Sequence, residues 1–149
     1  MKKFVFSLAA VYEYKQTVEK LQKADLSNAQ AVLRALQEEE QRLELAYDNN
    51  KKTLEEALAA GTGVADALMR HDAYFRYLRD AREMLAAKII KAEEHKEQCQ
   101  ALLITTMREL KTYENLRAEQ YADYLKEVQA EEEKNMGDLV SFNIISGNN

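Results

Sequence analysis

The residues best suited to chemistry in this chain are two histidines, one cysteine and short runs of glutamate. His71 and His95 lie far apart in the sequence, and we expect each to be solvated or at the edge of a helix seam rather than a metal ligand or a base. Cys99 falls on an apolar stripe, which favours a buried, unreactive thiol. The glutamates at 38–40 and 131–133 are typical of solvated helix faces. The sequence therefore predicts no catalytic, cofactor-binding or metal site, and its function should lie in what it contacts.

The composition is that of long helices. Charged residues make up 32% of the chain, aromatic residues make up 8%, and there is no proline. Apolar residues that recur every three or four positions in such a background indicate a coiled coil. A net charge of −5 argues against a nucleic-acid partner. No segment approaches the roughly 20 apolar residues that span a bilayer, so no direct membrane insertion is expected.

Residues 1–11 permit two interpretations. A lysine pair followed by the apolar run 4–11 is how a secretion signal begins, which would make this a secreted helical protein. The run is short, contains Ser7 and continues into Tyr12 and Glu13 with no polar cleavage region. We therefore expect the first turns of an amphipathic helix in a cytoplasmic protein.

The predicted fold is all-α, a long antiparallel two-helix coiled-coil hairpin that forms one domain over residues 1–149. Helix 1 is expected over about 4–59, a tip over about 60–72, helix 2 over about 73–136 and a mobile tail over 137–149. Gly61 and Gly63 mark the tip, and Gly137 marks the end of helix 2, because glycine takes the left-handed conformation that stops a helix. The apolar stripe predicted for helix 1 is Phe4, Leu8, Val11, Val18, Leu21, Ala29, Val32, Leu36, Leu43, Tyr47, Leu54 and Leu58.

The predicted helices are unequal in length, so the end of helix 2 should extend past helix 1. Folding about residues 62–66 pairs Phe4 with residues 120–128. Tyr121, Tyr124, Leu125 and Val128 would then lie in or near an overhang without a partner in this chain. Isolated apolar helices are unfavourable in water, which suggests that a binding partner covers them.

Aromatic residues also gather just after the predicted tip. Tyr74, Phe75 and Tyr77 cannot all face one seam, because neighbouring residues on a helix point in different directions. At least one ring should therefore be exposed, and exposed aromatic side chains favour partner binding. Folding about residue 62 would place Tyr47 opposite Tyr77, and Leu43 opposite Ala81.

The opening Phe4-x-Phe6-x-Leu8 resembles the start of the FliJ family of flagellar export proteins. Tyr74-x3-Leu78-x2-Ala81 resembles the aromatic-x3-Leu-x2-Ala element of that family just after its tip. The resemblance runs to about Asp138. Beyond it, an apolar tail with Leu139 replaces the charged end common in the family.

The resemblance implies a non-enzymatic, cytoplasmic stalk of the flagellar type III export ATPase, without a cofactor. Such a stalk sits in the pore of the hexameric ATPase, promotes ring assembly and hydrolysis, links the ring to the membrane export gate and escorts export chaperones. The alternatives are the equivalent stalk of a virulence secretion system, or a generic coiled-coil scaffold or chaperone with no ATPase partner.

The resemblance, together with the predicted overhang, gives two sets of site residues. The export-gate patch maps to Leu43, Tyr47, Tyr74, Leu78, Ala81 and Leu85, although each of these could instead be an ordinary seam residue. The end that would enter the ATPase ring carries Phe4, Phe6, Leu8, Tyr121, Tyr124, Leu125 and Val128.

Overall fold

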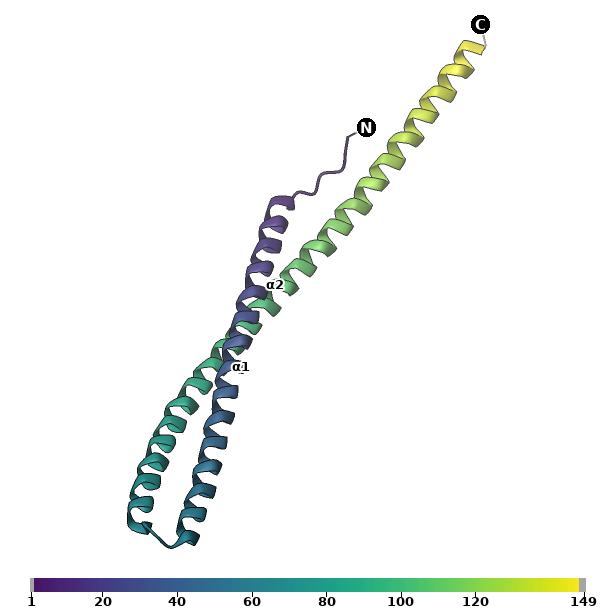
Figure 1. Cartoon of the computed structure of the whole chain (residues 1–149). Coiled ribbons are helices and arrows are strands. Elements are labelled where there is room, and N and C mark those ends of the chain that lie inside the picture. The colour runs from purple at the N-terminus through teal and green to yellow at the C-terminus, as the bar shows by residue number, and fades with distance from the viewer. Residues whose placement is uncertain (1, 148–149) are drawn as a thin grey trace. The chain divides into compact units, whose positions relative to one another are not determined.

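The computed structural model describes residues 2–147 and contains two α-helices joined by a three-residue turn (Figure 1). Helix α1 spans Ala9–Ala60, with 52 residues, and α2 spans Val64–Gly147, with 84 residues. No strand occurs in the described range. The predicted all-α helical hairpin is confirmed. Gly61 and Gly63 have φ angles of 74° and 66°, so both glycines adopt the left-handed conformation expected at the turn.

The chain enters α1 later than the sequence predicted, because residues 2–8 are not helical. Phe6 is buried and Phe4 half-buried, whereas Val5 between them is 79% exposed. An extended chain points alternate side chains to opposite sides, so it can turn both phenylalanines inward, whereas a helix would separate them widely around its axis. The Phe-x-Phe pattern is therefore that of an extended segment, and a helix start near residue 4 was wrong.

The structure also places the other helix boundaries at residues different from those predicted. The turn occupies only residues 61–63, and α2 begins at Val64 rather than near 73. Gly137 does not end the helix, which continues to Gly147. A single glycine costs a helix about 1 kcal/mol relative to alanine, and no proline follows to stop it. The last two residues of the predicted mobile tail lie outside the described residues.

The residues of the chain form two compact units. The turn unit comprises residues 21–103 and contains the Gly61–Gly63 turn. The end unit comprises the described residues of 1–20 and 104–149. Within the described residues, neither helix has a stretch that is long and apolar enough to cross a membrane.

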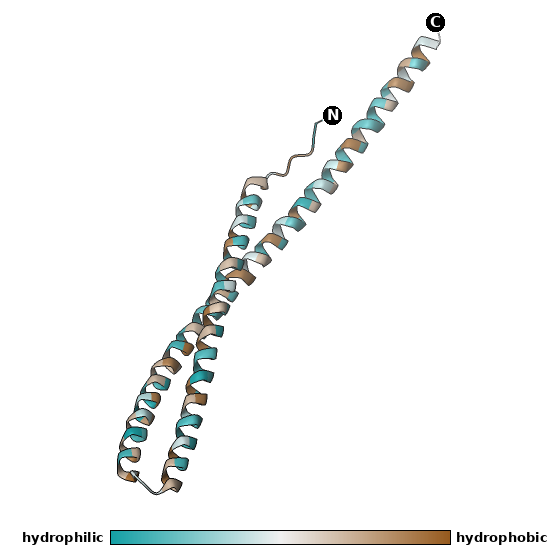
Figure 2. Ribbon diagram, viewed as in Figure 1, coloured by the Kyte–Doolittle hydropathy of each residue, from teal (hydrophilic) through white to brown (hydrophobic). Residues whose placement is uncertain are grey.

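The core of the turn unit is a seam with heptad spacing. Leu78, Leu85, Cys99 and Leu103 of α2 are buried, with the half-buried Ala92 in the same series. The α1 side of this seam differs in part from the predicted stripe. Val32 is 55% exposed and Leu21 is 62% exposed, whereas Leu33, which follows Val32 in the chain, is buried. Figure 2 shows how hydrophobic positions recur along both helices between hydrophilic ones.

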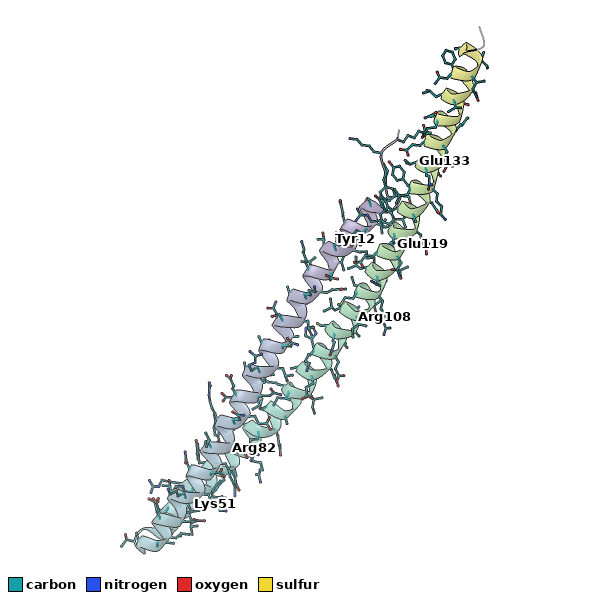
Figure 3. All side chains as sticks on the ribbon, turned by 90° about the vertical axis from the view of Figure 1, so that its right-hand side faces the viewer. Tyr12, Lys51, Arg82, Arg108, Glu119 and Glu133 are labelled. Carbon is teal, nitrogen blue, oxygen red and sulfur yellow. The ribbon has the colours of Figure 1, made fainter. Side chains whose placement is uncertain are left out.

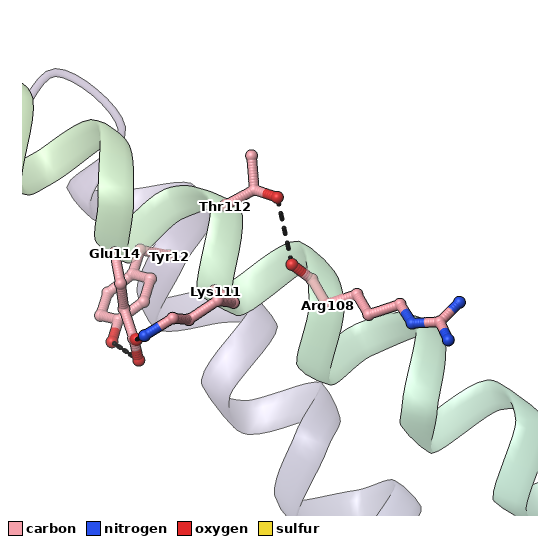
Figure 4. Close-up of polar contacts among 5 residues, drawn as sticks. All are labelled: Tyr12, Arg108, Lys111, Thr112 and Glu114. Atoms are coloured by element: carbon pink, nitrogen blue, oxygen red, sulfur yellow. Dashed lines mark hydrogen bonds and ion pairs between the residues drawn. The ribbon is translucent and has the colours of Figure 1, made fainter.

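The end unit has a thinner core, in which Phe6, Thr106 and Leu110 are buried. Polar contacts fix its antiparallel register. Lys15 Nζ lies 2.5 Å from Glu109 Oε2, and the Tyr12 hydroxyl donates to Glu114 Oε1 at 3.3 Å. Figure 4 shows the second contact, with Lys111 beside the same glutamate. Lys15 therefore occupies its seam position with an acidic partner.

Candidate partner-binding surfaces

The turn unit carries a cluster of four rings, Tyr47 from α1 with Tyr74, Phe75 and Tyr77 from α2. The Phe75 ring lies 4.9 Å from the Tyr47 ring, centroid to centroid. Tyr74 and Tyr77 stack on each other at 6.1 Å with an interplanar angle of 17°. Tyr47 was predicted to lie opposite Tyr77, but its ring meets that of Phe75. At least one exposed ring was predicted, and this is confirmed, since Tyr74 is 42% and Tyr77 is 64% exposed.

The residues predicted to contact an export gate differ in how exposed their side chains are. Leu78 and Leu85 are 1% and 7% exposed, so their side chains hold the two helices together. Leu43 and Ala81 are half-buried. Tyr47 and Tyr74 are the most accessible members of the set. A partner could reach the tyrosines without separating the helices, but it could not reach Leu78.

A shallow groove of about 850 Å³ runs beside this cluster. Its walls carry the rings of Tyr47 and Phe75 together with a set of charged side chains. The Arg82 guanidinium lies 6.0 Å from the centre of the Tyr47 ring, and Arg76 forms an ion pair with Asp72 at 3.0 Å. The remaining lining residues are Glu40, Arg79, Glu83 and Ala86. Aromatic and arginine side chains together are typical of surfaces that bind other proteins.

The end unit carries a second aromatic cluster, formed where residues 2–8 lie along α2. The Phe4 ring packs edge-on against Tyr121 at 5.1 Å and tilted against Tyr124 at 5.6 Å. The Tyr124 hydroxyl donates to the Lys2 carbonyl oxygen at 2.8 Å. Figure 3 shows side chains of the N-terminal segment gathered against α2 between Glu119 and Glu133. Tyr121 and Tyr124 were predicted to lack a partner in this chain, and that prediction is wrong.

The remaining residues predicted to enter an ATPase ring differ in exposure. Leu8 and Val128 are half-buried, and Phe6 is buried with its ring 6.5 Å from that of Tyr12. Leu125 and Tyr121 are each 47% exposed and lie one helical turn apart. These two side chains are therefore the ones that a partner could contact directly.

An overhang of α2 does exist, but it begins further along the chain than predicted. Every residue from 129 to 147 is exposed. The stretch carries glutamates at 131–133 and ends with an apolar portion that starts at Leu139, which is 62% exposed. Other large apolar side chains exposed there are Met136, Val140, Phe142, Ile144 and Ile145.

In the end unit, the fold changes the pKa values of the Tyr12 and Lys15 side chains. Burial raises the pKa of the Tyr12 hydroxyl, and the Glu114 carboxylate that accepts its hydrogen bond raises this pKa further. The hydrogen bond to Glu109 raises the pKa of the Lys15 ammonium. Both shifts favour the protonated side chain in the folded state.

A buried polar pair near the turn was not predicted. Asn50 is 8% exposed, its amide nitrogen donates to the His71 carbonyl oxygen at 3.2 Å, and its oxygen lies 2.5 Å from His71 Nδ1. A signal was present in the sequence, since Leu36, Leu43 and Asn50 are spaced seven residues apart. His71 lies at the seam edge, as expected.

His95 and Cys99 also meet, with Nε2 3.7 Å from Sγ, as their spacing of four residues on one helix allows. The sequence prediction overlooked this spacing. Among the described residues, no three His, Cys, Asp or Glu side chains could together hold a metal ion. We therefore treat the pair as a packing contact.

Comparison with known protein families gives a match over nearly the whole chain. The family model described as "Flagellar FliJ protein" matches residues 4–149. No curated protein and no solved structure matches the chain. The matched region includes both helices and both aromatic clusters.

Proposed function

The chain belongs to the flagellar FliJ protein family, and from this premise we propose that it is a non-enzymatic stalk and coupling component of the flagellar type III export ATPase. In this role it promotes assembly and activity of the ATPase ring, links the ring to the export gate and escorts export chaperones. One observation carries the proposal, namely that the family match covers residues 4–149 and thus both arms of a helical hairpin. The family description favours the flagellar apparatus over a virulence secretion system.

The two aromatic clusters supply two separate surfaces for two partners. We assign the end unit to the ATPase ring, where the half-exposed Tyr121 and Leu125 would make the contact. We assign the cluster of the turn unit to the export gate, with Tyr74 and Tyr47 as its accessible rings. The protein would act at the cytoplasmic face of the inner membrane, bound to the export apparatus and not inserted in the bilayer.

Purified chain added to the purified export ATPase tests the proposal. Wild-type chain should raise the rate of ATP hydrolysis and the fraction of assembled hexamers. The double variant Tyr121→Ala with Leu125→Ala should lose most of this stimulation, because it removes two accessible apolar contacts without touching a buried residue.

Ile90→Ala provides a matched control, since Ile90 is another large apolar residue of α2, 57% exposed and located in the turn unit. It should stimulate hydrolysis as the wild type does. A folded wild-type chain that neither binds nor stimulates the ATPase would leave the scaffold alternative as the better account. Full stimulation by the double variant would instead move the ATPase contact elsewhere on the chain.

A further inference from the structure

Residues 2–8, here called the strap, form the only described segment of the end unit that is not helical. Lys2, Lys3, Val5 and Ser7 are exposed along it. Its inward side chains are Phe4 and Phe6. The segment is therefore attached along one line of contacts, in which Phe4 lies against α2 and the Phe6 ring lies 6.5 Å from that of Tyr12 in α1.

The surface under the strap offers three distinct kinds of contact. The stacked rings of Tyr121 and Tyr124, 6.1 Å apart, receive the Phe4 ring. The Tyr124 hydroxyl binds a backbone carbonyl oxygen, that of Lys2. The Gln120 side chain accepts from the Ser7 amide at 3.3 Å and donates to the Ser7 hydroxyl at 2.9 Å.

These contacts are those of a peptide-binding site. Two of them engage backbone groups, a carbonyl oxygen that every residue has and an N–H that every residue except proline has, and the ring contact selects an aromatic side chain. A shallow pocket at the same place is lined by Lys2 and Lys3 of the strap and by Asp123 and Glu127 of α2, so opposite charges face each other. The site thus fits a basic extended segment with aromatic residues at alternate positions.

We propose that Gln120, Tyr121 and Tyr124 of α2, with Tyr12 of α1 beside the second ring, form a docking site for an extended aromatic-x-aromatic protein segment, and that the strap is a displaceable occupant of this site. The strap competes with such a partner segment because both need the same rings and the same Tyr124 hydroxyl. Its attachment to Ala9 keeps it near the site at high effective concentration, so the isolated chain is closed. A partner's aromatic-x-aromatic segment binds there only when it replaces the strap.

The inference does not depend on an ATPase or gate, and it is tested with a labelled synthetic peptide of sequence Lys-Lys-Phe-Val-Phe-Ser-Leu, identical to residues 2–8. Fluorescence anisotropy measures its binding to the full-length wild type and to the full-length double variant Phe4→Ala with Phe6→Ala, which should open the strap. Val5→Ala is the matched control, because Val5 is exposed between the two rings and should leave the strap closed.

The opened variant should bind the peptide at least tenfold more tightly than the wild type and Val5→Ala do, since loss of one interface aromatic commonly costs about tenfold or more in binding. Adding Tyr121→Ala and Tyr124→Ala to the opened variant should abolish the binding. A peptide with both phenylalanines replaced by alanine should bind none of the proteins.

Circular dichroism establishes that the opened variant keeps its helices. If the opened variant loses helix, the single variant Phe4→Ala, which leaves the buried Phe6 in place, replaces it, and the same tenfold tighter peptide binding is expected. Equal binding of the peptide to the wild type and to the opened variant would show that the strap does not occupy the site. No binding to a folded opened variant would show that the site holds the strap only as a part of the fold.

Discussion

A pair of substitutions one turn apart on α2 separates partner binding from stability at the turn unit. Leu78 is 1% exposed and Tyr74 is 42% exposed. Replacing a buried leucine by alanine costs about 2–5 kcal/mol. A two-helix seam lies close to solvent and can partly collapse, so we expect about 2–3 kcal/mol for Leu78→Ala. At about 2–4 °C per kcal/mol for a chain of this size, the melting temperature should fall by roughly 5–10 °C.

Tyr74→Ala should behave in the opposite way. Its ring loses a stack with Tyr77, and a ring pair contributes about 0.5–1.5 kcal/mol beyond burial when both rings are enclosed. Both rings are partly exposed here, so the melting temperature should fall by about 2 °C or less. If Tyr74 contacts the export gate, losing the ring should weaken gate binding by about 2 kcal/mol, roughly thirtyfold.

Two measurements are made on each variant. Circular dichroism follows thermal unfolding, and binding to the purified cytoplasmic domain of the gate protein is measured below the melting temperature of that variant. Leu78→Ala should bind normally once corrected for its folded fraction, and Tyr74→Ala should stimulate the ATPase normally. The reasoning is refuted if Tyr74→Ala melts as early as Leu78→Ala and loses gate binding only in proportion to its unfolded fraction, because Tyr74 would then be a core residue.

Three further predictions concern the fold. Asn50→Ala should lower the free energy of unfolding in urea by about 2 kcal/mol, since two hydrogen bonds to His71 are lost, whereas Asn50→Leu should stay within about 1 kcal/mol because apolar burial offsets them. Gly61→Ala should destabilise the chain by about 1 kcal/mol, because its φ of 74° strains a residue that has a side chain. Gly137→Ala should slow hydrogen exchange of the backbone amides around it, because alanine favours the helix more than glycine does. The free energy of unfolding should fall as the pH rises above 10.0, the tyrosine pKa of the unfolded chain, and on through the higher pKa that Tyr12 has in the folded chain. The reason is that the unfolded chain loses this proton first. The loss measured between pH 9 and 11 should be smaller for Tyr12→Phe; an equal loss would contradict the assignment.

The sequence predicted the fold well because helical periodicity over a long chain leaves few alternatives. It predicted the contacts less well, for reasons that particular residues show. Val32 and Leu33 are adjacent apolar residues, and only the position of the opposite helix decides that Leu33 is buried. Asn50 was passed over because a polar residue does not register in an apolar stripe, although its heptad position placed it in the seam.

The predictions about the two ends of the chain were wrong for a different reason. The overhang prediction assumed that residue 4 already lay in a helix, which left Tyr121 and Tyr124 without a partner. The alternation of Phe4, Val5 and Phe6 was the signal for an extended segment, and three residues are too few to show a period of two within a helical pattern. Gly137 shows the converse, because a strong stop signal was overridden where nothing else ended the helix.

The same ring pair occurs twice on α2, and the two copies differ in what covers them. Tyr74 with Tyr77 and Tyr121 with Tyr124 are each three residues apart and stack at 6.1 Å. Phe4 lies on the second pair and shows that such a pair receives an aromatic ring from an extended segment. The first pair has Ala73 in the place of Gln120 and Arg76 in the place of Asp123. It therefore lacks the amide that binds Ser7 and one of the two acidic residues that face the lysines of the strap, while Asp80 stands in the place of Glu127. The ring pair is shared, but the residues around it would select different partners.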